Sequence, residues 1–87
     1  MNRQTLLTFP CDFPIKVMGE WREDFSAEIQ RAVLPLSGQL SPERIEVRES
    51  SGGKYLSLTL LLEAHSQEQL DAVYRTLTSH PWVKVVL

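Results

Sequence analysis

A row of leucines at alternate positions, Leu56, Leu58, Leu60 and Leu62, constrains the fold of this 87-residue chain more than any other feature. Successive side chains of a β-strand point to opposite faces, so this row predicts a strand with one strongly apolar face. An apolar sheet face is stable only when a second layer of structure covers it. The chain must therefore supply both partner strands and a cover.

Three other segments, residues 13–18, 44–49 and 82–87, alternate in the same way and are predicted to be strands. In the last of them Val83, Val85 and Leu87 are expected to face the core. In the second, charged residues alternate with Ile45 and Val47, as suits an edge strand that resists pairing with other chains.

Two segments show the period of an amphipathic helix. The apolar stripes are Phe25, Ile29, Val33 and Leu36 in the first, and Leu70, Val73, Tyr74 and Leu77 in the second. Pro35 is expected to end the first helix near Leu34, because proline disfavours a helical conformation in the residue before it. Residues 66–69, Ser-Gln-Glu-Gln, form a capping box that predicts the start of the second helix, and Pro81 prevents that helix from continuing.

The predicted order is strand, helix, strand, strand, helix, strand. This is the ferredoxin-like βαββαβ plan of the α+β class: a four-stranded antiparallel sheet with two helices on one face. The first and third strands are expected at the centre and the second and fourth at the edges. We predict a single domain over residues 1–87, with residues 1–11 as a less regular N-terminal extension.

Composition narrows the function classes. The net charge of −2 argues against nucleic acid as the main partner, because phosphate binding depends on clustered basic residues. The one cysteine, Cys11, has no partner for an internal disulfide, which favours a reducing compartment. No secretory signal or membrane-spanning segment is evident, and a cytoplasmic location is expected.

The stretch SSGGKY at residues 50–55 superficially resembles a phosphate-binding loop. A P-loop, however, connects a strand to a helix and ends in Lys followed by Ser or Thr, whereas here Lys54 is followed by Tyr55 between two strands. Glycines between alternating runs predict a hairpin turn instead.

The sequence gives little support for a metal site or a catalytic site. His65 and His80 are expected at opposite ends of the second helix, too far apart to share a metal ion, and Cys11 has no nearby sulfur ligand. His80 is interpreted as a helix C-terminal residue favoured by the helix dipole. No serine lies in a nucleophile motif, and the third strand lacks the asparagine that an acylphosphatase-type site would need. We therefore expect no enzymatic activity and no cofactor.

The uncovered face of the sheet is a candidate contact surface. On this plan it carries Lys16, Met18, Tyr55, Ser57, Thr59, Leu61, Trp82, Lys84 and Val86. Several large apolar side chains on one open face favour a contact with another subunit. Single-stranded nucleic acid, bound through Tyr55 with Lys16, Lys84, Arg44 and Arg48, is the alternative.

The turn after the first strand, Met18-Gly19-Glu20-Trp21, is a second candidate site. A glycine beside a helix N-terminus would let a small anionic ligand meet free backbone amides. In the simpler interpretation, Gly19 only turns the chain and Trp21 packs on the helix ends.

The sequence resembles the YbeD-like family of small uncharacterised bacterial proteins over nearly its whole length. The resemblance is carried by the Lys16-Val17-Met18-Gly19 run, the Ser50-Ser51-x-Gly53-x-Tyr55 hairpin, and residues around His65, Glu68-Gln69, Leu70–Leu77 and Val85–Leu87. It implies a βαββαβ fold similar to ACT regulatory domains. ACT domains bind small effectors between paired domains, near the loop that corresponds here to Met18–Trp21.

The resulting functional hypothesis is a non-enzymatic regulatory or adaptor module. We expect it to self-associate, with a dimer favoured, and to contact a small metabolite or a protein partner. Nucleic acid and membrane are not expected as partners, and no metal site is predicted.

Overall fold

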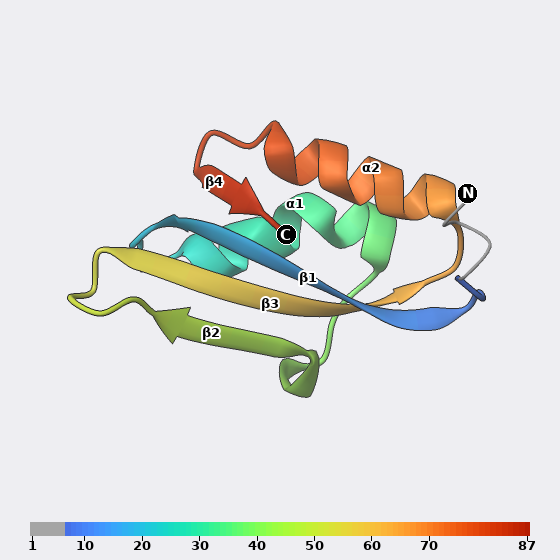
Figure 1. The fold of residues 1–87 in the computed structure, drawn as a ribbon, viewed down its shortest axis with the longest axis horizontal. Coiled ribbons are helices and arrows are strands. Elements are labelled where there is room, and N and C mark those ends of the chain that lie inside the picture. Colours follow the sequence, from blue (N-terminus) through green and yellow to red (C-terminus); the bar gives the residue numbers. More distant parts are fainter. Residues whose placement is uncertain (1–6) are drawn as a thin grey trace.

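The structure is a computed structural model and describes residues 7–87. Its elements are β1 (Cys11–Glu20), α1 (Phe25–Ser37), a short 3-10 turn η2 (Pro42–Arg44), β2 (Ile45–Glu49), β3 (Tyr55–Ala64), α2 (Gln67–Thr78) and β4 (Val83–Val86) (Figure 1). Leaving the 3-10 turn aside, this order confirms the βαββαβ prediction.

The sheet is antiparallel, with the strand order β2-β3-β1-β4. β1 and β3 lie at the centre and pair along their whole lengths, from Cys11 with Ala64 to Glu20 with Tyr55. β2 and β4 are the edges, as predicted. In Figure 1, β2 forms the edge far from both helices, whereas β4 lies next to α2.

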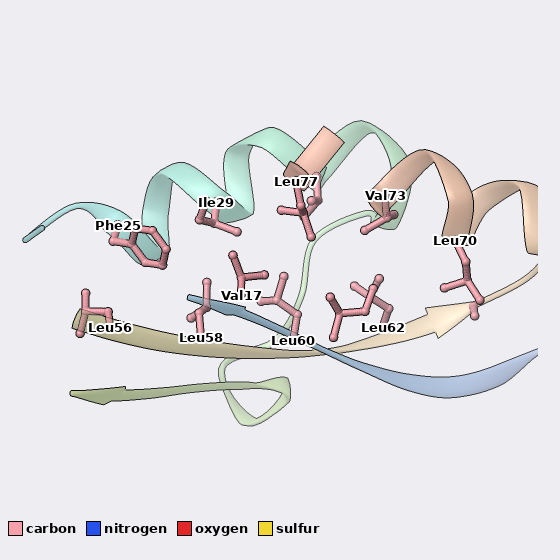
Figure 2. Close-up of a cluster of buried hydrophobic side chains, with 13 residues drawn as sticks. Val17, Phe25, Ile29, Leu56, Leu58, Leu60, Leu62, Leu70, Val73 and Leu77 are labelled. Atoms are coloured by element: carbon pink, nitrogen blue, oxygen red, sulfur yellow. The ribbon is translucent and has the colours of Figure 1, made fainter. Parts of the chain in front are cut away.

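The core lies between the sheet and the two helices. Leu58, Leu60 and Leu62 are fully buried and Leu56 is 6% exposed, so the leucine row faces the helices as predicted. Figure 2 shows these side chains pointing toward the apolar stripes of α1 and α2. Burial of such side chains stabilises a fold by roughly 1.5–3 kcal/mol each, before the cost of ordering the chain.

The prediction that α1 ends near Leu34 was wrong, because the helix continues through Pro35 to Ser37. Proline lacks an N–H group, so this position removes one hydrogen bond of the last turn. Gly38 closes the helix by donating its N–H to the carbonyl of Leu34 at 2.9 Å, with a positive φ of 72°.

The start of α2 follows the predicted capping pattern with one difference. The Ser66 hydroxyl accepts the N–H of Gln69 at 3.0 Å, while the Gln69 side-chain oxygen accepts the N–H of His65 rather than that of Ser66. The Gln69 amide also donates to the carbonyl of Leu36 at 3.0 Å. One side chain thus caps α2 and ties it to the end of α1.

The SSGGKY stretch is a hairpin turn between β2 and β3. Gly52 and Gly53 have φ values of 89° and 73°, which residues with a side chain rarely adopt. Ser50 donates its N–H to the carbonyl of Tyr55 at 2.9 Å and closes the turn.

At the other end of the chain, β1 begins at Cys11, the last residue of the predicted N-terminal extension. Leu7 and Phe9 of that extension pack against the core, and residues 1–6 lie outside the described residues.

Candidate functional site

Gly19 lies inside β1 and is buried. It does not turn the chain, since β1 continues to Glu20, and its φ is not positive. A Cβ atom at this position would overlap the carbonyl oxygen of Trp82 and lie 2.7 Å from Cε1 of Phe25. The strand pairing with β4 is irregular between Met18 and Gly19. Glycine is therefore required here by close packing of β1 against the start of α1 and the entry to β4.

Trp21 joins the β1–α1 connection to the β2–β3 hairpin. Its backbone N–H donates to the carbonyl of Lys54 at 2.9 Å, and its indole Nε1–H donates to Oε2 of Glu49 at 3.1 Å. The side chain is nevertheless 47% exposed. Both hydrogen bonds connect Trp21 to the hairpin.

Glu20, Trp21, Lys54 and Tyr55 line a shallow cavity of about 290 Å³, which we call the Trp21–Tyr55 notch. Glu20 and Tyr55 are directly paired across β1 and β3, which places the turn residues beside the open face of the sheet. Tyr55 is 45% exposed. Two aromatic side chains therefore remain nearly half exposed, next to the Glu20 carboxylate and the Lys54 ammonium group, while the Glu49 carboxylate accepts the indole N–H of Trp21.

The charges around this turn do not favour an anion. The Trp21 amide is already hydrogen-bonded, and α1 begins only at Phe25, beyond the carboxylates of Glu23 and Asp24. Of the predicted ligand-binding residues, Glu20 and Trp21 line the notch, whereas Gly19 is buried in the core and Met18 lies on the open face.

The open face of the sheet differs from the prediction in β4. Val86 pairs with Val17, whose side chain is in the core, so Val86 faces the helices and Val85 takes the place beside Met18 on the open face. The irregularity between Met18 and Gly19 shifts the alternation by one residue, because a strand's two faces exchange with a single-residue offset. The predicted orientation of Val86 was wrong for this reason.

Trp82, which was also predicted to lie on the open face, lies elsewhere. Its ring packs against the core, 5.6 Å from the ring of His80 in an edge-to-face arrangement, and the guanidinium of Arg22 lies 4.2 Å above it. Lys84 is exposed, and its Nζ lies 3.8 Å from Oε2 of Glu20. The predicted face residues that do lie together on β1 and β3 are Lys16, Met18, Tyr55, Ser57, Thr59 and Leu61.

His80 and Glu28 form a contact that sequence analysis missed. Nε2 of His80 lies 2.8 Å from Oε2 of Glu28, and Nδ1 accepts the backbone N–H of Trp82 at 3.0 Å. Nε2 therefore carries the proton and donates to Glu28. Since both ring nitrogens are engaged and the side chain is 11% exposed, the pair links α1 to the α2–β4 loop and has no free nitrogen for proton transfer.

Glu28 also accepts two hydrogen bonds from Arg31, at 2.8 and 2.6 Å. The bonds from Arg31 and then His80 lower the pKa of Glu28 to about 2. No local sequence signal could have revealed the His80 contact, because the two residues are 52 positions apart.

His65 and His80 flank α2, as predicted. Within residues 7–87, no three His, Cys, Asp or Glu side chains are grouped so that they could hold a metal ion. Over the same residues, the helices are too short and too polar to cross a membrane.

These features define a small ferredoxin-like α+β protein with an open sheet face and an aromatic notch at one end of that face. Residues 4–87 match the family DUF493, described as proteins of unknown function. A UPF0250 protein of Ralstonia nicotianae is 52% identical over 98% of this chain and 88% of its own length. UPF0250 proteins of Paraburkholderia phymatum and Bordetella pertussis are 51% and 44% identical over 97% of this chain and 94% and 92% of their own lengths. The chain belongs to the DUF493/UPF0250 family, which confirms its resemblance to YbeD-like proteins.

Proposed function

We propose that this protein is a non-enzymatic regulatory or adaptor module that self-associates and binds a small ligand at the Trp21–Tyr55 notch. One observation carries the proposal: Trp21 and Tyr55, from the two regions singled out by sequence, line one cavity and stay nearly half exposed. Exposed aromatic side chains are enriched at binding surfaces, because they bury a large area with little loss of conformational freedom.

The chemistry of the notch suits a small zwitterion. Glu20 offers a carboxylate for an ammonium group, in exchange for its 3.8 Å contact with Lys84. Lys54 offers an ammonium for a carboxylate, and the two rings offer apolar surface. An amino acid carries all three features. The single thiol, Cys11, fits a cytoplasmic site of action.

Single-stranded nucleic acid is the weaker alternative. Trp82 is not available for stacking on the open face, and three of the four basic residues proposed for phosphate contacts are paired with carboxylates. Arg44 bonds Asp12 at 2.5 Å, Arg48 bonds Glu46 at 3.0 Å, and Lys84 lies near Glu20. Each phosphate contact would have to displace such a pairing.

The ligand-binding part is tested by thermal-shift measurements with a panel of protein amino acids. At least one amino acid should raise the unfolding temperature, because a ligand that binds only the folded state stabilises it. Replacement of Tyr55 by Ala should abolish that shift, whereas Thr59→Ala, on the same face of β3 but outside the notch, should preserve it. A panel with no effect on the wild-type protein would overturn the ligand-binding part.

The self-association part is tested separately by light scattering at high micromolar concentration. We expect a mass above that of the 10.0 kDa chain. A monomer at every concentration would overturn this part while leaving ligand binding intact.

A further inference from the structure

The outer edge of β2 presents backbone groups in an ordered pattern. Ser50 bonds Tyr55 of β3 through its N–H, so by antiparallel alternation the even-numbered residues of β2 bond to β3. The odd-numbered residues Ile45, Val47 and Glu49 therefore direct their N–H and C=O groups to the outside. The N–H of Ile45 is already donated to Pro42. Within residues 7–87, the remaining outward groups have no strand beside them.

The side chains of this edge are also ordered. Glu46 and Arg48 stand on the open face, opposite Thr59 and Ser57 of β3, and bond each other at 3.0 Å. Val47 stands on the helix-facing side but is 49% exposed. In Figure 1, β2 is the edge of the sheet that lies far from both helices.

We propose that a second copy of this chain pairs with the first along β2, antiparallel, about a two-fold axis through Val47. In this register Val47 faces Val47 of the second copy. The outward N–H of each Val47 donates to the C=O of the other. The N–H of each Glu49 reaches the free carbonyl of Ile45 in the other copy. Every outward group is thereby used except the carbonyl of Glu49.

Charge complementarity selects this register and this partner. A two-fold axis at Val47 places Glu46 of each copy opposite Arg48 of the other, so two oppositely charged pairs form across the junction. A shift of the axis by one residue, to Glu46 or Arg48, would place like charges opposite each other. The alternating charges that deter pairing with other chains thus complement a second copy of the same strand.

The other edge strand, β4, does not have self-complementary charges. β4 carries one charged residue, Lys84, which no carboxylate of β4 could face in a second copy. Pairing through β2 would also join the two open faces into one continuous surface of eight strands, with a notch on each half. The inference rests on the proposed self-association and specifies its interface.

The test exchanges the charges in two single variants, Glu46→Arg and Arg48→Glu. Each variant alone places like charges opposite each other in both pairs, so its dissociation constant should rise about tenfold or more. A mixture of the two restores opposite charges in the heterodimer, and should associate about as tightly as the wild-type protein. Glu68→Arg and Arg75→Glu, the same changes on exposed positions of α2, are the controls and should leave association unchanged.

Analytical ultracentrifugation gives the dissociation constants, and circular dichroism checks that the variants are folded. A wild-type dimer whose affinity does not change in either variant would overturn the β2 interface but leave self-association standing. Two weakened variants that fail to associate when mixed would overturn the register. A wild-type monomer would overturn self-association and the interface together.

Discussion

His80 and Glu28, 52 positions apart in the chain, connect α2 and α1, with Nε2 of His80 2.8 Å from Oε2 of Glu28. Glu28 stands in the first turn of α1, and His80 follows the last turn of α2. The same carboxylate binds Arg31, so one residue receives hydrogen bonds from its own helix and from the loop before β4.

This arrangement makes stability depend on pH in a defined window. The pKa of Glu28 falls from an ordinary 4.5 to about 2 in the folded chain. A carboxyl whose pKa is lowered by folding contributes stability above its unfolded pKa and loses it as pH falls through the folded value. Glu28→Gln should therefore lower the free energy of unfolding at pH 7, and its difference from wild type should shrink between about pH 4.5 and 2.

Urea denaturation at several pH values measures this difference. Glu23→Gln, the same change at an exposed position before α1, is the control and should show little effect at any pH. A Glu28→Gln difference that stayed constant down to pH 2 would contradict the prediction.

Replacement of Gly19 by Ala should destabilise the protein by roughly 1–3 kcal/mol or more, because overpacking forces neighbouring atoms apart. The added methyl group meets the Trp82 carbonyl and the Phe25 ring. Gly52→Ala is a useful comparison, since nothing lies within 4 Å of its Cβ position and only the backbone conformation, φ 89°, resists the change. Thermal unfolding should show a larger fall in unfolding temperature for Gly19→Ala than for Gly52→Ala. Equal falls would mean that the space around Gly19 can accommodate a methyl group.

Adjacent leucines on β3 provide a test of the two faces of the sheet. Leu60 is fully buried, and Leu60→Ala should cost about 2–5 kcal/mol, as expected when a core side chain is replaced by a cavity. Leu61 is only half-buried on the open face, so Leu61→Ala should cost much less. Chemical denaturation compares the two, and a larger loss at Leu61 would argue that a second layer covers the open face.

Ser66→Ala should cost about 1 kcal/mol, because the hydroxyl that accepts the Gln69 N–H is lost from the start of α2. Ser79→Ala, at the other end of the same helix, should have a smaller effect, since Ser79 closes the helix through its backbone N–H. Equal losses of unfolding free energy in the two variants would show that the Ser66 cap does not stabilise the protein.

Sequence periodicity predicted the elements that bury an apolar face. The leucine row, the α1 stripe and the α2 stripe each depend on residues close in the chain, and each was placed correctly. The hairpin at residues 50–55 and the Ser66 cap were also predictable, because glycine conformation and side-chain capping are local effects.

The errors arose where a contact between distant segments decided the outcome. Alternation alone placed Val86 on the open face, but the irregular pairing opposite Met18 and Gly19 reversed it. Alternation also placed Trp82 on the open face, yet its ring packs beside the ring of His80 and under the guanidinium of Arg22. The sequence around Gly19 suggested a turn or a ligand site, whereas the ring of Phe25 and the Trp82 carbonyl explain it.

The amino-acid order by itself determined which stretches become strands and helices and which of their faces are apolar, because side-chain direction repeats with a fixed local period. Only the tertiary structure decided that Trp21 and Tyr55 share one notch and that Glu28 meets His80. Those relationships join residues dozens of positions apart. Strand register and helix placement set them, and no local pattern encodes either one.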